Sequence, residues 1–203
     1  MTMECERAGF WTAWGEGSVA VADGRLVEVT LPSLPAVLAP LQAVEGAAGA
    51  VAEPSEVAPG DASHRRAAPA PAAPVPTTAP EWARELEAYF RRARLTWSGD
   101  EVDLSHLGLT AFREAVYRAL LGVRPGTVVT YGELAAAAGR PRAARAVGSA
   151  MAENPIPVVV PCHRVVRSDG SLGRYGDDER WKPLLLALEG LSTESAKPLV
   201  GAP

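Results

Sequence analysis

The sequence predicts an α+β fold, in which a small antiparallel β-sheet near the N-terminus precedes a mainly helical C-terminal part. Residues 9–31 alternate small or apolar with polar side chains around Asp23-Gly24, a strong hairpin signal. From Glu81 onwards, apolar residues recur at helical spacing instead. A stretch poor in large side chains separates the two patterns, and 203 residues suffice for one large or two small domains.

The N-terminal domain is expected over residues 1–42, with two antiparallel strands over 18–22 and 25–31. Trp11 and Trp14 are expected to pack on this sheet. Residues 43–80 are dominated by alanine, proline, glycine and valine, so they have little surface to bury. We expect them to form an extended or disordered linker or insertion.

Two helices are predicted next, and residues 81–109 contain the first helix and its connection to the C-terminal domain. Trp82, Leu86, Tyr89 and Phe90 recur at helical spacing and predict a short amphipathic helix. The second helix should begin near Thr110 and end before Gly122. Its buried stripe is predicted to be Phe112, Val116, Leu120 and Leu121.

A helix-turn-helix follows. Thr130 and Glu133 form a capping box for a helix over 131–138, which Gly139 should end. Pro141 suits the first turn of a second helix that runs to about residue 152. Such a pair can place its second helix in a DNA groove, but helix pairs of this size are also common in protein cores.

A last helix is predicted to end at Glu189. It would begin at Asp178 if that residue is the N-cap, or near Trp181 because Pro183 fits only a first turn.

Cys162 follows an apolar, proline-rich run and precedes His163 and Arg164. A reactive cysteine must form a thiolate, which a neighbouring base and a fixed positive charge favour. The pattern is equally compatible with a small apolar cysteine in a buried strand. Cys5 is interpreted as an incidental residue.

Charge and composition exclude several classes of protein. The formal charge of −4 argues against binding nucleic acid through bulk charge. However, residues 110–175 hold nine arginines and four acids, an excess of +5 that fits either a polyanion partner or solvated helix surfaces. Two cysteines provide neither a disulfide framework nor a four-ligand zinc site. We expect no metal, no cofactor and no membrane segment, and a cytoplasmic location.

Three motifs together resemble a known family. They are Arg145-Ala146-Val147-Gly148, Asn154-Pro155 and Pro161-Cys162-His163-Arg164-Val165. This combination is similar to that of the O6-alkylguanine-DNA alkyltransferases (methylated-DNA–protein-cysteine methyltransferases). The resemblance is dense from Phe112 to Gly190 and faint over residues 1–35. It implies a ribonuclease H-like N-terminal domain, a DNA-binding alkyltransferase domain over 110–190 and a loose tail over 191–203.

The resemblance also implies an activity. Cys162 would take the alkyl group from O6-alkylguanine in double-stranded DNA, irreversibly and once per molecule. The target base would have to leave the helix. The protein would act as a monomer, associated with the nucleoid when bound to DNA.

Site residues are carried over from the family by matching positions. The expected catalytic residues are Cys162, His163, Glu189, Asn154 and Tyr131. Adjacent residues of an extended chain point to opposite sides, so Cys162 and His163 are expected to communicate through a water molecule. The expected substrate-binding residues are Val165, Tyr175, Gly176, Pro157 and Met151. The expected DNA-binding residues are Arg145, Arg142, Tyr131, Ala144, Gly148 and Ser149.

Two alternative functions stay open. A protein of the same architecture could bind alkylated bases without repairing them, although such relatives replace the cysteine. A cysteine hydrolase is less consistent with the sequence, because hydrolases bring cysteine and histidine together from distant segments.

Asp177-Asp178 replaces the paired glycines usual after the pocket tyrosine and could repel DNA.

Overall fold

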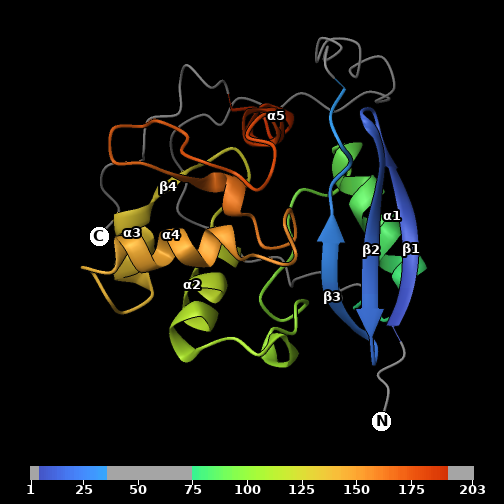
Figure 1. Ribbon diagram of the computed structural model, residues 1–203, viewed down its shortest axis with the longest axis horizontal. Helices are drawn as coiled ribbons and strands as arrows, with labels where there is room; N and C mark the ends of the chain where they lie inside the picture. Colours follow the sequence, from blue (N-terminus) through green and yellow to red (C-terminus); the bar gives the residue numbers. More distant parts are fainter. Residues whose placement is uncertain (1–4, 36–74, 192–203) are drawn as a thin grey trace, which may run out of the picture.

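The computed structural model describes residues 5–35 and 75–191, and in it a three-stranded sheet lies beside a helical part (Figure 1). The sheet has the antiparallel order β1 (Cys5–Thr12), β2 (Gly15–Ala22) and β3 (Arg25–Thr30). The hairpin at Asp23-Gly24 is confirmed, and both residues have positive φ angles, 49° and 73°. The prediction of two strands was incomplete, because β1 pairs with β2 along its whole length.

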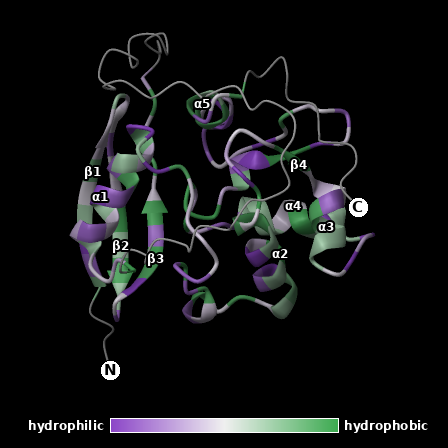
Figure 2. Cartoon of the chain, turned by 180° about the vertical axis from the view of Figure 1, so that it is seen from behind, coloured by the Kyte–Doolittle hydropathy of each residue, from purple (hydrophilic) through white to green (hydrophobic). Residues whose placement is uncertain are grey.

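Helix α1 (Ala79–Phe90) packs against β1 and β2 (Figure 1; Figure 2). Its N-terminus has the capping box of Thr78 and Glu81, and its predicted apolar stripe is buried. Phe10 of β1 stacks on Phe90 at 5.9 Å between ring centroids. Trp14 is buried as expected, but Trp11 is 62% exposed. The period of two along a strand explains this error, because Trp11 points away from the face that carries Phe10.

The helical part contains short elements held by local signals. They are α2 (Ala111–Leu121), β4 (Val129–Thr130), α3 (Tyr131–Ala137), α4 (Ala144–Ala152), the 3-10 turn η4 (Cys162–Arg164), β5 (Val165–Val166) and α5 (Trp181–Leu188). A further 3-10 turn, η3 (Ser105–Leu107), precedes them. The capping box at Thr130 and the positive φ of Gly139 are confirmed, so α3 and α4 form the predicted helix-turn-helix.

One predicted helix start was wrong, and for another helix the structure decides between two predicted positions. Helix α4 begins at Ala144 rather than Pro141, because Ala143 N donates to Arg140 O and closes a tight turn that contains the proline. Helix α5 begins at Trp181, the later of the two predicted positions, and Pro183 lies in its first turn. Asp178 is not the N-cap, because its carboxylate accepts from Arg180 N outside the helix.

The sheet and the helical part share one hydrophobic core and are joined by hydrogen bonds. Val29 N of β3 donates to Pro155 O at 2.9 Å. Trp181 Nε1 of α5 donates to Pro32 O at 3.0 Å, and its ring packs edge-on against Trp14 at 5.6 Å. The sheet is therefore fixed against the segment that precedes Cys162.

The predicted linker over 43–80 and tail over 191–203 lie mostly outside the described residues, so these boundaries stay predictions. Among the helices that the structure describes, none has the length and apolar character needed to cross a bilayer.

The capping box at Thr130 sets the start of α3, so its removal should cost stability. We expect Thr130→Ala to lower the free energy of unfolding by about 1 kcal/mol, because the first-turn N–H of Glu133 loses its acceptor. Glu133→Gln is the matched control, since glutamine also completes a capping box. Urea unfolding of both variants tests this, and equal losses would contradict it.

Candidate active site

Cys162 lies in a tight turn rather than in an extended strand, contrary to the sequence-based interpretation. Cys162 N donates to Val160 O at 2.8 Å, and Arg164 N donates to Pro161 O at 2.9 Å. The preceding residues are not an extended run either, because Val160 N donates to Ile156 O at 3.0 Å and closes a turn. Cys162 and His163 are therefore not separated by the alternation of an extended chain that the sequence predicted. Even so, the structure describes both residues and shows no direct hydrogen bond between them.

Asn154 holds the turn and contacts the sulfur directly. Its Nδ2 donates to Cys162 Sγ at 3.1 Å and to Val160 O at 2.9 Å, while its Oδ1 accepts from Ile156 N at 3.1 Å. The loop that Asn154 spans contains Val158 at a φ of 74°, a strained angle for a β-branched residue. The amide of Asn154 thus fixes the loop and stabilises negative charge on the sulfur.

The Cys162 side chain is a neutral thiol in the resting protein. Burial raises its pKa, and the donors around it only partly offset this. The hydrogen bond from Asn154, the nearby hydroxyl of Tyr175 and the positive charge of Lys182 favour the thiolate. The sulfur therefore needs a local base that removes its proton at the moment of reaction.

His163 is the best candidate for the base that removes the thiol proton of Cys162. Its ring is fully buried, and Nε2 donates to Glu189 Oε1 at 2.8 Å. Burial lowers the pKa of His163 more than Glu189 raises it, so the imidazole is neutral at neutral pH. The other ring nitrogen, Nδ1, is buried and has no hydrogen-bond partner within the described residues. It is thus free to accept a proton.

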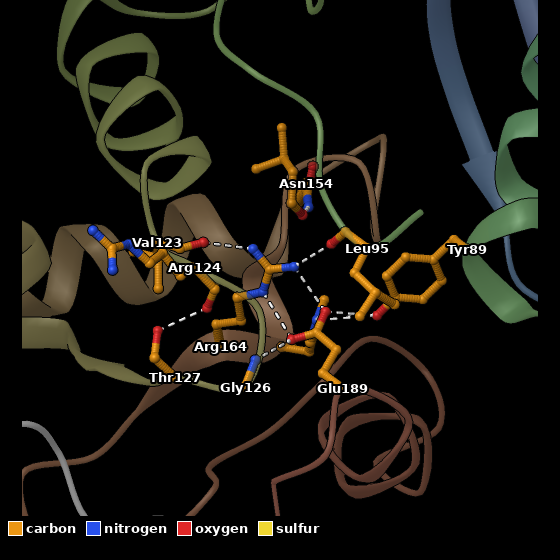
Figure 3. Close-up of polar contacts among 11 residues, drawn as sticks. Tyr89, Leu95, Val123, Arg124, Gly126, Thr127, Asn154, Arg164 and Glu189 are labelled. Atoms are coloured by element: carbon orange, nitrogen blue, oxygen red, sulfur yellow. Dashed lines mark hydrogen bonds and ion pairs between the residues drawn. The ribbon is translucent and has the colours of Figure 1, made fainter. Parts of the chain in front are cut away.

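Glu189 is surrounded by donors (Figure 3). Arg164 binds it with two bonds, from Nε to Oε2 at 3.0 Å and from Nη2 to Oε1 at 2.7 Å. Tyr89 donates to Oε1 at 2.8 Å and Gly126 N donates to Oε2 at 3.3 Å. Burial opposes ionisation, but the hydrogen bonds and charges of His163 and Arg164 hold the pKa of Glu189 at about 2. Glu189 is therefore a permanent carboxylate.

A cavity of about 990 Å³ opens beside Cys162, between the sheet and the helical part. Four of the predicted substrate-binding residues line it, namely Met151, Pro157, Tyr175 and Gly176. Val165 does not line it, being fully buried with its carbonyl accepting from Lys182 Nζ at 2.5 Å. Residues 27–34 form the opposite wall, which sequence reasoning did not predict. Only the packing of the two parts reveals this wall.

Asp177 and Asp178 have different surroundings. Both residues line the cavity, but among the described residues an ion pair is found for Asp178 and not for Asp177. The carboxylate of Asp178 binds the guanidinium group of Arg180, at 2.6 Å for Oδ2 to Nη2. The negative charge of Asp178 is thus neutralised by Arg180.

The predicted DNA-binding residues lie on the helix-turn-helix and outside the cavity. Tyr131 is the first residue of α3, and the Lys182 ammonium group lies 6.0 Å from its ring centroid. On α4 and the preceding turn, Arg142, Arg145 and Ser149 are exposed, whereas Ala144 and Gly148 are half-buried. Small side chains leave the backbone of α4 accessible to a close partner.

The basic excess of residues 110–175 is smaller at the surface than the sequence indicates. Arg164 is buried against Glu189, and Arg113 and Arg118 form ion pairs with Glu153 and Glu114. Within the described residues, no ion pair is found for five others: Arg124, Arg140, Arg142, Arg145 and Arg167. Positive charge free to meet a polyanion is thus concentrated near the helix-turn-helix and the loop after β5.

No group of three or more histidine, cysteine or acidic side chains within residues 5–35 and 75–191 could hold a metal ion.

Comparison with known proteins places these residues in a family context. The family model described as "6-O-methylguanine DNA methyltransferase, DNA binding domain" matches residues 111–191. A methylated-DNA–protein-cysteine methyltransferase of Haemophilus influenzae is 36% identical over 133 residues, which cover 59% of this chain and 74% of the relative. The mouse protein of the same name is 46% identical over 115 residues. That match covers 53% of each chain, so only about half the length of the rodent relative is represented.

Solved structures agree with the sequence comparison. The structure of Mycobacterium tuberculosis OGT in complex with DNA is similar with a TM-score of 0.62 and 28% identity, covering 95% of both chains. An O6-methylguanine-DNA methyltransferase of Pyrococcus kodakaraensis gives a TM-score of 0.54 at 26% identity, covering 93% of this chain and 100% of its own. The similarity therefore includes the N-terminal sheet as well as the helical part.

The depressed pKa of Glu189 predicts a pH dependence of stability. Its contribution is complete above the ordinary pKa of 4.5 and is lost as the pH falls towards about 2, because over this range the unfolded state binds a proton that the folded state does not. We expect Glu189→Gln to lower the free energy of unfolding by about 3 kcal/mol near pH 6, since Arg164 loses its partner charge.

The difference in the free energy of unfolding between wild type and Glu189→Gln should shrink as the pH falls from about 4.5 to about 2. Urea unfolding across this range measures it. Glu179→Gln is the control, because Glu179 is exposed and makes only a 3.5 Å contact with Arg174. A gap that does not depend on pH would refute the assignment.

Proposed function

Because the chain belongs to the methylated-DNA–protein-cysteine methyltransferase family, we propose that it repairs DNA by transferring the alkyl group of O6-alkylguanine to Cys162. The observation that carries this proposal is the setting of the sulfur. Cys162 Sγ accepts a hydrogen bond from the Asn154 amide and borders a cavity large enough for a purine base. The next residue, His163, is buried and paired with Glu189, so it can serve as the proton acceptor.

The chemical step is a substitution at a saturated carbon. His163 Nδ1 accepts the thiol proton, through a bridging water molecule, and the imidazolium is stabilised by the carboxylate of Glu189 at Nε2. The sulfur electron pair forms the S–C bond while the C–O6 bond breaks, and guanine leaves as an anion with the electrons of the C–O6 bond. The proton held by the His163 imidazolium, passed on through water, then neutralises the departing base. Asn154, through its bond to Sγ, stabilises the thiolate before attack.

The product is a thioether at Cys162, so each molecule acts once. A thioether carbon has no good leaving group, and within the described residues no second thiol approaches Cys162, since Cys5 lies exposed on β1. The protein is thus a stoichiometric methyltransferase, self-inactivating, which needs neither metal nor cofactor.

Double-stranded DNA is the proposed partner. The O6 atom lies inside the duplex, so the nucleotide must rotate into the cavity. We assign the extrusion to Tyr131, at the start of α3, and to Arg145, whose planar cation can occupy the vacated stack. Arg142, Ala144, Gly148 and Ser149 complete the DNA-facing surface of α4. We expect a monomer that is associated with the nucleoid when DNA is bound.

Transfer of a labelled alkyl group distinguishes repair from mere recognition. A duplex that carries labelled O6-methylguanine should leave its label on the peptide that contains Cys162, with at most one label per protein. Cys162→Ala should abolish transfer but bind the duplex nearly as well, because the alanine removes only the sulfur. Binding by wild type without transfer would instead support an alkylated-base sensor, and absence of both would refute the proposal.

Arg145 should matter for duplex substrates only. We expect Arg145→Ala to slow transfer from duplex DNA by at least about tenfold, because the extruded base is no longer replaced. Reaction with a free O6-alkylguanine base should change by less than about twofold, since no stacking is disrupted. Arg91→Ala, an exposed arginine on α1, is the control. Equal losses on both substrates would contradict the role in extrusion.

A further inference from the structure

Tyr89 brings a hydroxyl group into the active site from α1, which lies outside the segment that matches the family model. The hydroxyl donates to Glu189 Oε1 at 2.8 Å and its oxygen lies 3.4 Å from His163 Nε2. His163 Nε2 itself lies 2.8 Å from the same Oε1 atom. With Arg164 Nη2 at 2.7 Å, three donors therefore meet at this one carboxylate oxygen. The sequence predicted only a core position for this tyrosine.

Given the proposed alkyl transfer, we propose that Tyr89 is a positioning residue of the proton relay. Its hydroxyl fixes Glu189 Oε1 opposite His163 Nε2, so that the imidazole keeps its proton at Nε2 and presents the free Nδ1 atom as the acceptor of the thiol proton. Tyr89 acts through Glu189 and His163 and does not touch the alkyl group.

Tyr89 can serve only as a donor. The charged and titratable groups that face it are Glu189, Arg164, His163, Cys162 and Tyr175. Burial raises the pKa of Tyr89, the negative charge of Glu189 raises it further, and Arg164 only partly opposes them. The hydroxyl thus keeps its proton at neutral pH and donates it to Oε1. That fixed donor makes Oε1 a weaker base, so the shared proton stays on His163.

The ring of Tyr89 cannot swing away from this position. It is fully buried, stacks on Trp97 at 6.0 Å with an interplanar angle of 25°, and meets the His163 ring edge-on at 6.4 Å. Phe90 contacts it edge-on at 5.4 Å. Replacement of Tyr89 by phenylalanine would keep these ring contacts and remove only the hydroxyl oxygen.

Tyr117 provides a matched control. Its ring is also fully buried, and its hydroxyl donates to Ala150 O at 2.8 Å, away from Glu189. Tyr117→Phe therefore removes the same atoms and a hydrogen bond of the same length. Tyr89→Phe should lower the melting temperature somewhat more than Tyr117→Phe, because the acceptor of Tyr89 is a carboxylate. Melting curves that show both variants folded at the assay temperature would leave the relay as the source of any difference in reactivity.

The test follows alkylation of Cys162 by iodoacetamide, with mass spectrometry of the Cys162 peptide, from about pH 6 to about pH 10. All variants carry Cys5→Ser, because Cys5 is exposed and would consume the reagent. We expect Tyr89→Phe to react about tenfold more slowly than its parent near pH 7, because His163 is no longer held in place. The difference should narrow at high pH, where hydroxide removes the thiol proton without the relay. Tyr117→Phe should follow the parent at every pH.

A double-mutant cycle with His163→Ala completes the test. If Tyr89 acts through His163, Tyr89→Phe will cause no further loss once the imidazole is absent. An equal loss in both backgrounds, or a Tyr89→Phe profile that matches Tyr117→Phe, would overturn the proposal. Iodoacetamide is the alkyl donor in this test, so the result does not depend on binding or repair of DNA. Failure of the assay with labelled DNA would contradict the proposed function and not the role of Tyr89.

Discussion

The carboxylate of Glu189 is the interaction on which the site depends. It ends α5 as the C-cap residue, where the partial negative charge of the helix terminus disfavours an acid. Burial adds to this cost. Five hydrogen bonds offset it, from Tyr89, Gly126, His163 and, twice, Arg164. An energetically unfavourable position thus becomes the point at which α1, the loop after α2, η4 and α5 are joined.

The same contacts determine the protonation states around the sulfur. Arg164 keeps Glu189 ionised, the carboxylate orients His163, and burial leaves the imidazole neutral. The thiol is also neutral at rest, since burial raises its pKa. A neutral pair is more stable inside a protein than a separated thiolate and imidazolium, so charge develops only during reaction. The thiol at rest is therefore less nucleophilic than a thiolate would be.

Local signals allowed much of the fold to be predicted from the sequence. The capping box at Thr130 and the glycine at 139 set the bounds of α3, because these signals act within one turn of the helix. Strand β1 was missed, since its formation depends on pairing with β2 more than on its own alternation. Trp11 shows the same limit, as a strand residue cannot be assigned to a face before the register is known.

The residues of the site also fall into those that the sequence predicted and those that only the fold reveals. Cys162, His163, Asn154 and Glu189 were expected from family motifs, and the structure brings them into contact. Tyr89 and the cavity wall over residues 27–34 come from segments with no motif of their own. Both reach the site because the sheet is fixed to the helical part, through Val29 N and Pro155 O among other contacts. The helical part alone would lack one donor to Glu189 and one wall of the cavity, so the sheet and α1 are as much a part of the site as the motif that contains Cys162.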